Sequence, residues 1–374
     1  MSGRRRRAIA IVGLAAAAVA GVAFAYLRPV LLPEHVRTSA SASPPTITVP
    51  GEQVAITFLT PRIGWAAATV EPLEHTLFVF ATDDGARSWR QTATLTMSVS
   101  VAAPPHIFRF FDETHGVLGL GNDGSIFRTN DGGRSWSRVS LPEGAWPPVF
   151  ADFNDLWAIT YSGPSSAAKI YSTTDGGASW ARLPDLPVNG AVVFDNPNDG
   201  WLAADRQRVY RTTDGGRTWH RLGDLPRAEC TQAPHQCAAG GAGVNLTLLS
   251  DGGLLAEDYA YEPQVVFISL NGGLGWRQVP LPPGAIDWNQ VSYQDSMHWW
   301  LVNDNRLLKT ADAGASWTVV SSSLPFALSQ PTILDSDHAW VTFGEGDSSA
   351  VGDVLLITSD GGLSWKRAVV PIPH

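Results

Sequence analysis

The chain has 374 residues, of which 44% are hydrophobic and 16% are charged, and its formal net charge is −9. This charged fraction is too low for a disordered or coiled-coil protein, and the length allows a large hydrophobic core. The 36 glycines and 26 prolines interrupt the chain often. Beyond residue 50 no apolar repeat of helical period is sustained, so the sequence predicts an all-β protein of many short strands joined by turns.

The N-terminal segment differs from the rest. Four consecutive arginines (4–7) precede an uninterrupted apolar run from Ala8 to Leu27. About 20 apolar residues cross a bilayer, and the arginines favour the cytoplasmic side. We therefore expect a basic cytoplasmic N-terminus (1–7), a single-pass transmembrane anchor in the cell membrane (8–27) and an extracytoplasmic remainder. The alternative is a cleaved signal peptide and a secreted protein, because Ala23-Phe24-Ala25 has the small-x-small cleavage pattern.

Residues 28–50 are predicted to be a linker, rich in Ser, Ala and Pro, that holds the domain off the membrane. Residues 1–37 contain six arginines and one glutamate, so 20 basic and 34 acidic residues remain beyond them, a formal charge of −14. An acidic body of this kind repels nucleic acid and anionic lipid surfaces. The sequence thus excludes nucleic acid as a partner, and we expect membrane contact through the N-terminal helix only.

The two cysteines, Cys230 and Cys237, lie in the segment CTQAPHQC. In an oxidising compartment a local disulfide is the expected state of such a pair. A metal site is the alternative, but it needs more ligands than these two cysteines and His235. We expect a disulfide, no bound metal and no cofactor.

An eight-residue motif, Ser/Thr-x-Asp-x-Gly-x-Ser/Thr-Trp, recurs seven times. Its copies are TDDGARSW (82–89), TNDGGRSW (129–136), TTDGGASW (173–180), TTDGGRTW (212–219), SLNGGLGW (269–276), TADAGASW (310–317) and TSDGGLSW (358–365). The first copy has Ala86 at the glycine position, and the fifth has Asn271 and Gly275 in place of Asp and Ser/Thr. The tryptophans are spaced by 39 to 57 residues, close to the ~40–50 residues of a four-stranded propeller blade.

The residue types of the motif are those of a hairpin turn. An Asp carboxylate accepts hydrogen bonds from nearby backbone N–H groups, Gly adopts positive φ without strain, and Trp anchors the turn on apolar surface. In the fourth unit we expect strands at 191–194, 200–204, 209–212 and 219–222. The residues assigned this structural role are Asp84, Trp89, Asp131, Trp136, Asp175, Trp180, Asp214, Trp219, Asn271, Trp276, Asp312, Trp317, Asp360 and Trp365.

A second set of tryptophans recurs on the predicted second strands. These are Trp65, Trp157, Trp201, Trp300 and Trp340, with Val117 and Leu254 in the other two units. The two sets account for twelve of the fifteen tryptophans and are expected to form core rather than a cofactor cage. One unit cannot bury both of its faces, but seven in a closed ring can. The sequence therefore predicts a single seven-bladed β-propeller of four-stranded blades over residues 51–374.

The motif resembles the Asp-box, or bacterial neuraminidase repeat. This repeat occurs in sialidases, xyloglucan-cleaving glycosidases, sortilin-type receptors and the photosystem II assembly and stability factor family. The last is the most similar, because it too is a single seven-bladed propeller and its blades read like HGVLGLGNDGSIFRTNDGGRSW (115–136) and DGWLAADRQRVYRTTDGGRTW (199–219). The resemblance covers residues 51–374 and implies a non-enzymatic scaffold that holds a client protein. That family's client surface is basic, whereas the domain here is acidic.

A sialidase-like, carbohydrate-active propeller is the alternative function. The resemblance to sialidases would require three arginines converging on a carboxylate, a Tyr–Glu nucleophile pair and an Asp acid. The predicted inner strands contain only Arg109, and Arg62 is expected on the side of the boxes. Glu257 and Tyr259 could form the Tyr–Glu pair. Because motif matches without the geometric set are weak, we expect no catalytic residues.

Three histidines, His115, His298 and His338, precede second strands in equivalent positions. A shared metal site is one interpretation. Equivalent positions in a ring point along separate radii, however, so we expect turn residues rather than ligands.

Loop length distinguishes the two faces of the predicted ring. The boxes all lie on one face, and long connections occur on the other, where an insertion at about 223–243 joins units 4 and 5. Length variation on one face of a repeat scaffold marks a binding face. Acidic and aromatic residues there suit a cationic protein segment or a glycan, although solvated loops without a ligand would look the same. The candidate partner-binding residues are Arg109, Trp146, Tyr161, Glu257, Asp258, Tyr259, Tyr261 and Glu262. We expect the partner to be an extracytoplasmic or membrane protein.

Overall fold

The structure is a computed structural model. It describes residues 53–69, 75–96, 105–120, 126–145, 147–161, 167–204, 208–227, 243–259, 265–280, 291–303, 305–326, 330–343 and 354–371. The predicted anchor or signal peptide (8–27), the linker (28–50) and the cysteines Cys230 and Cys237 lie outside these ranges. Within them, no helix has the length and apolar character needed to span a bilayer.

The described residues form seven four-stranded antiparallel sheets, each made from four consecutive strands. Blades 1 and 2 are β1 (Gln53–Phe58), β2 (Gly64–Thr69), β3 (Thr76–Thr82), β4 (Arg90–Thr96), β5 (Ile107–Phe110), β6 (Gly116–Gly119), β7 (Ile126–Thr129) and β8 (Ser137–Val139). Blades 3 and 4 are β9 (Val149–Phe150), β10 (Leu156–Thr160), β11 (Lys169–Thr173), β12 (Ala181–Arg182), β13 (Gly190–Phe194), β14 (Gly200–Ala204), β15 (Arg208–Thr212) and β16 (His220–Asp224). Blade 5 is β17 (Val244–Leu248), β18 (Leu254–Asp258), β19 (Val265–Ser269) and β20 (Arg277–Val279). Blades 6 and 7 are β21 (Val291–Tyr293), β22 (Trp299–Asn303), β23 (Arg306–Thr310), β24 (Thr318–Ser321), β25 (Thr332–Ile333), β26 (Ala339–Phe343), β27 (Val354–Thr358) and β28 (Lys366–Ala368).

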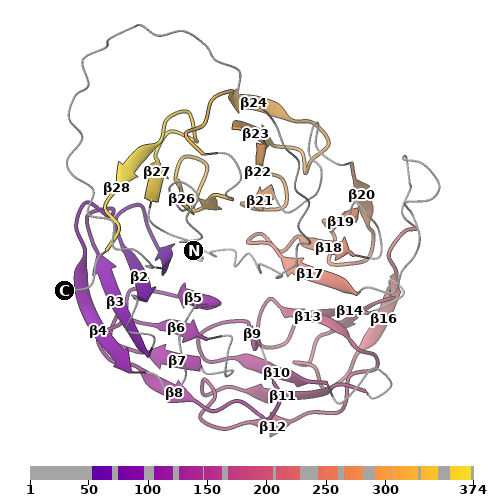
Figure 1. The fold of residues 1–374 in the computed structure, drawn as a ribbon. Helices are drawn as coiled ribbons and strands as arrows, with labels where there is room; N and C mark the ends of the chain where they lie inside the picture. Colours follow the sequence, from indigo (N-terminus) through magenta and orange to yellow (C-terminus); the bar gives the residue numbers. More distant parts are fainter. Residues whose placement is uncertain are drawn as a thin grey trace, which may run out of the picture.

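The seven sheets are arranged around a common axis, with the first strand of each blade nearest the centre and the fourth at the rim (Figure 1). Burial follows this order, because every residue of the second strands β2, β10 and β14 is buried, whereas the fourth strands β4 and β12 are largely exposed. The predicted all-β, seven-bladed propeller is therefore confirmed. In the fourth unit the predicted strands agree with the observed ones to within two residues.

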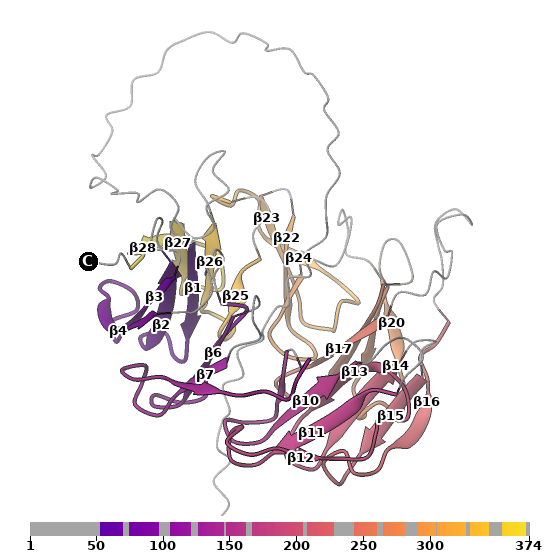
Figure 2. The same cartoon turned by 60° about the horizontal axis from the view of Figure 1, so that its bottom comes forward.

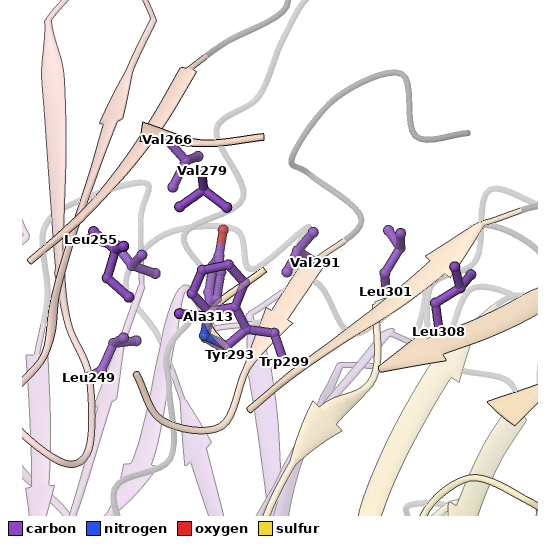
Figure 3. Packing of buried hydrophobic residues seen from close by; sticks show 11 residues of the cluster. Leu249, Leu255, Val266, Val279, Val291, Tyr293, Trp299, Leu301, Leu308 and Ala313 are labelled. Atoms are coloured by element: carbon purple, nitrogen blue, oxygen red, sulfur yellow. The ribbon is translucent and has the colours of Figure 1, made fainter. Parts of the chain in front are cut away.

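The core lies between neighbouring blades, not inside any one of them. Most of the buried apolar clusters combine residues of two adjacent blades, and Figure 3 shows the cluster between blades 5 and 6. Trp157 of blade 3 stacks on Phe194 of blade 4, with ring centroids 3.5 Å apart and planes within 4°. Trp65 of blade 1 stacks in the same way on Phe110 of blade 2, at 3.7 Å. The prediction that the second-strand tryptophans form core is thus confirmed.

The same tryptophans also tie each blade to the next box turn. The indole N–H groups of Trp65, Trp157 and Trp201 donate to the carbonyl oxygens of Gly132, Gly215 and Gly272, at 2.8 to 3.0 Å. Each acceptor is the residue that follows the Asp, or in blade 5 the Asn, of the next box. One side chain therefore supplies both apolar contact and a directional hydrogen bond across the blade interface.

Two details of the predicted core need correction. Strand register pairs Leu255 with Ile268, as it pairs Trp201 with Arg211, so Leu255 and not Leu254 stands at the tryptophan position of blade 5. In addition, the box tryptophans are only partly buried, whereas Trp157 and Trp201 are 2% and 5% exposed. The reason is their position directly before the fourth strands, which lie at the rim and are the most exposed.

Blade 2 has no tryptophan on its second strand, and an arginine makes the contact with the next blade instead. Val117 stands at the tryptophan position, and its strand partner Arg128 extends toward blade 3. There the guanidinium lies 3.7 Å from the centre of the Phe153 ring and donates to the Asn154 side chain at 3.2 Å. Burial lowers the pKa of Arg128, while the charges of Asp175 and Asp152 oppose that effect. A cation–π contact thus replaces the indole at this interface.

The ring closes between blades 7 and 1 by the same indole-to-carbonyl hydrogen bond that links two blades inside it. Figures 1 and 2 both place blade 7 beside blade 1. The indole of Trp89 in blade 1 donates to the carbonyl of Val369, the first residue after β28, at 2.7 Å. In blade 3 the indole of Trp180 donates to the carbonyl of Ser140, the first residue after β8, at 2.9 Å. The backbone N–H of Val369 also donates to the carbonyl of Ala86 at 3.0 Å, so closure needs no strand shared between the first and last blades.

Candidate functional site

The seven box turns lie on one end of the blades, here called the box face. They share one hydrogen-bond network, which box 4 illustrates. The Thr212 hydroxyl donates to Asp214 Oδ1 and accepts from the backbone N–H of Gly216, and the Thr218 hydroxyl donates to Asp214 Oδ2 at 2.6 Å. The backbone N–H of Thr218 donates to Asp214 Oδ1 at 2.8 Å. Both carboxylate oxygens are therefore used inside the turn.

The network has an electrostatic consequence. Hydrogen bonds from Ser88, Ser316 and Ser364 to the box carboxylates lower the pKa values of Asp84, Asp312 and Asp360 to about 2. A carboxylate that accepts several hydrogen bonds is stabilised in its charged form. The box aspartates are thus held ionised by their own turns.

The box turns also accommodate the departures from the motif. Asn271 Oδ1 of box 5 still accepts the backbone N–H of Gly275 at 2.8 Å, but no hydroxyl is present at that position to donate. Ala86 and Ala313 stand in boxes 1 and 6 with φ of 61° and 57°. These alanines take the left-handed conformation that glycine adopts at lower cost.

The three histidines are part of the turns that precede the second strands. In each case Nδ1 lies 2.8 to 2.9 Å from a carboxylate oxygen three residues earlier, which pairs His115 with Asp112, His298 with Asp295 and His338 with Asp335. The backbone N–H of each histidine donates to the same aspartate. Each histidine thus closes its own turn in a separate blade.

The opposite face carries the connections between second and third strands. At the end of β18 in blade 5, the Tyr259 hydroxyl donates to Glu257 Oε2 at 2.9 Å, and the Asn245 side chain donates to the same oxygen at 3.5 Å. Tyr259 is 39% exposed. Burial, together with the charge of Glu257, raises the pKa of Tyr259. The structure therefore brings together two of the predicted partner-binding residues as a hydrogen-bonded pair, with Tyr259 exposed and Glu257 half-buried.

Other predicted residues lie apart from this pair. Asp258 is 2% exposed and alternates with Glu257 along β18, so it lies on the side of the strand occupied by Leu254 and Ala256, which pack against blade 4. Tyr161 is 53% exposed on blade 3, and its hydroxyl donates to the carbonyl of Gly190 in blade 4 at 2.9 Å. Asp258 therefore lies on the opposite side of β18 from Glu257, and Tyr161 is exposed on a different blade.

Arg109 lies on β5, one of the innermost strands. Its guanidinium lies 4.5 Å from the centre of the Phe111 ring, and burial lowers the pKa of Arg109 to about 10. Among the described first strands of the seven blades, Arg109 is the one arginine. Arg62 lies on the box face, as expected, where its Nε donates to the carbonyl of Asp83 at 3.2 Å.

The interface between blades 5 and 6 contains one more residue, which the sequence did not reveal. Tyr293 on β21 of blade 6 packs against blade 5 and is 8% exposed. Only the stacking of blade 5 on blade 6 brings Tyr293 to this interface, and no spacing in the sequence signals it. The predicted residues Trp146, Tyr261, Glu262, Cys230 and Cys237 lie outside the described residues.

Comparison with known proteins agrees with this geometry. The model of the BNR/Asp-box repeat matches residues 210–221, the turn of box 4. Together with the seven sheets, this match decides the architecture. The chain is a seven-bladed Asp-box β-propeller. No curated protein matches its sequence.

Solved structures similar to this Asp-box propeller include proteins of different kinds. A structure described as YCF48 bound to D1 peptide is 20% identical, with 70% of this chain and 81% of that chain covered and a TM-score of 0.49. The protein lmo1340 from Listeria monocytogenes EGD-e is 8% identical, with coverage of 86% and 95% and a TM-score of 0.51. The GH74 enzyme of Niastella koreensis is 13% identical, with coverage of 79% and 61% and a TM-score of 0.30. At these identities the similarity concerns the fold alone.

Proposed function

We propose that this Asp-box propeller is a non-enzymatic, extracytoplasmic scaffold that binds a protein partner through the face opposite its boxes. The observation that carries the proposal is the Glu257–Tyr259 pair, a carboxylate and an aromatic ring presented together at the solvent-facing end of blade 5. Aromatic side chains are enriched at the energetic centres of protein interfaces. The charge of −14 beyond residue 37 favours a cationic segment as the partner's contacting surface.

The box face supports the proposal by contrast. Its carboxylates accept hydrogen bonds from their own turns. At Asp214, hydroxyl and backbone donors occupy both oxygens. A partner would have to compete with these donors for the carboxylate oxygens. The opposite face has side chains that can contact a partner without cost to the fold.

We further propose that residues 8–27 anchor the propeller to the cell membrane and that residues 28–50 hold it away from the surface. The supporting observations are the four arginines before the apolar run and the length of the run. A membrane-bound scaffold would meet its partner at or near the membrane. Cell fractionation tests this arrangement. An anchored protein is found in the membrane fraction with residues 8–27 intact, whereas a secreted protein is found in the medium with that segment removed.

Site-directed photocrosslinking tests the partner face. A photoreactive amino acid is placed at position 259 in the full chain, and in a matched variant at position 274, because Leu274 is 70% exposed in a turn of the box face. We expect a discrete protein adduct from position 259 and none from position 274. Adducts from position 274 alone, or from neither position, would contradict the proposal.

A glycoside-processing role is the second candidate, and one observation favours it. Tyr259 and Glu257 form the hydrogen-bonded Tyr–Glu pair that such a mechanism needs, with 2.9 Å between the two oxygens. Against it, the described first strands supply one arginine, Arg109, and its guanidinium packs on Phe111. Hydrolysis of a fluorogenic sialoside by the wild type and not by Tyr259→Phe would favour this candidate, and we expect no hydrolysis by either.

A further inference from the structure

The interface between blades 5 and 6 contains a polar cluster formed by Asn245, Glu257, Tyr259 and Tyr293. Strand register aligns Asn245, Glu257 and Val266 across blade 5. Leu255 and Val266 belong to the apolar cluster that contains Tyr293, and Glu257 follows Leu255 by two residues on the same side of β18. The Glu257 carboxylate therefore points from blade 5 toward blade 6.

Tyr293 contributes a buried hydroxyl without a partner. Its ring packs edge-on against Trp299, with centroids 5.1 Å apart, and in Figure 3 its oxygen points toward the blade 5 side, where Val266 and Val279 lie. No protein group in the described part of the chain forms a hydrogen bond with this oxygen. Buried polar groups in native proteins are nearly always paired, so among the described residues this hydroxyl is the one buried polar group of the cluster with bonding capacity left for a ligand.

The remaining groups hold a negative charge on the side of blade 5 that faces Tyr293. Both hydrogen bonds to the Glu257 carboxylate, from Tyr259 and Asn245, end on Oε2. Burial, and then the charges of Glu257 and Tyr259, hold the pKa of Tyr293 far above its usual value, so this phenol stays neutral. The cluster thus combines one carboxylate, two phenol rings and one unpaired hydroxyl oxygen.

We propose that this cluster binds a single organic cation, the ammonium or guanidinium group of a lysine or arginine side chain of the partner. The inference rests on the proposed function and names the side chain that the opposite face recognises. An N–H cation pairs with the carboxylate by charge-assisted hydrogen bonds, its further N–H groups can donate to the Tyr293 oxygen, and the phenol rings attract positive charge. An anion would be repelled by Glu257, and a neutral ligand would leave the carboxylate without a counter-charge.

Small cations test this site without knowledge of the partner. The full chain, labelled with 13C in its tyrosine rings, is titrated with ethylguanidinium and n-butylammonium, and with neutral ethylurea as the matched control. We expect saturable shifts of the Tyr259 and Tyr293 signals with both cations and none with ethylurea. The Tyr161 signal should stay unchanged, because Tyr161 lies on blade 3 with its hydroxyl bound to Gly190.

Two variants locate the site. Glu257→Gln keeps the shape of the side chain and should weaken cation binding at least tenfold. Tyr293→Phe removes only the unpaired hydroxyl and should weaken binding about threefold without loss of stability, so it remains informative if Glu257→Gln folds poorly. Shifts of equal size with ethylurea, an absence of saturable shifts, or full affinity in both variants would overturn the proposal.

The test of the cation site can fail or succeed independently of the test of the scaffold proposal. If cations bind as expected but position 259 crosslinks no partner, the cation site stands and the scaffold proposal fails. If position 259 crosslinks a partner whose capture is unchanged by Glu257→Gln, the scaffold proposal stands and this inference fails.

Discussion

The two ends of the blades use polar side chains in opposite ways. On the box face, carboxylates such as Asp214 are occupied by hydroxyl and backbone donors of their own turns. At the opposite end of blade 5, the half-buried Glu257 carboxylate accepts a hydrogen bond from the exposed Tyr259, and in blade 6 the buried Tyr293 hydroxyl has no partner among the described residues. The repeated turns thus maintain the ring, whereas the face that we propose for binding is the one opposite them, where second and third strands are joined.

The largest expected effect is on the blade interfaces. Trp157→Ala removes an indole that is 2% exposed, stacks on Phe194 and donates to Gly215. It should lower the free energy of unfolding by about 3–5 kcal/mol, as for other buried aromatic side chains. Trp180→Ala, at a partly buried box tryptophan, is the control and should cost less than half as much. Denaturant unfolding checks both, and equal costs would contradict the distinction between the two sets of tryptophans.

The box network gives the next effect. Thr212→Val removes a fully buried hydroxyl that donates to Asp214 and accepts from the N–H of Gly216. Leaving that N–H unpaired should lower the free energy of unfolding by about 1–3 kcal/mol. Thr247→Val on the inner strand β17 is the matched control, and it should change stability by no more than about 0.5 kcal/mol. A neutral Thr212→Val would show that the box hydroxyl is dispensable.

Acid sensitivity should follow from the same turns. The pKa values of Asp84, Asp312 and Asp360 are about 2 in the folded protein, below the value of about 3.9 in an unfolded chain. The stabilisation from these groups is therefore complete above about pH 4 and is lost as the pH falls through about 2. Carboxyl carbon NMR shifts recorded from pH 6 downward should show midpoints near 2, and midpoints near 4 would refute the assigned network.

The smallest effect concerns backbone conformation in the boxes. Gly133 has φ of 86°, and a Cβ there would meet its neighbours at an ordinary distance of 3.6 Å. Gly133→Ala should therefore cost about 1 kcal/mol from left-handed backbone strain alone. Gly223→Ala, with open space and no positive φ, should be neutral or slightly stabilising. Unfolding midpoints compare the two, and similar losses in both would exclude φ as the cause.

The sequence predicted the repeated features well because each depends on residues close together in the chain. A box needs only eight residues, as in TTDGGRTW (212–219), and the blade count and strand order follow from the spacing of the boxes. Features formed between blades could not be predicted in this way. The packing of Tyr293 against blade 5, and the Arg128–Phe153 contact that takes the place of an indole between blades 2 and 3, depend on how one blade stacks on the next.

An ethylguanidinium titration of Glu257→Gln and Thr212→Val side by side tests the separation of the two faces most directly. If the box face maintains the fold and the opposite face binds, Glu257→Gln should lose at least tenfold in affinity with its stability intact. Thr212→Val should be less stable but should bind as tightly as the wild type while folded. Loss of binding in Thr212→Val, or undiminished binding in Glu257→Gln, would contradict the account.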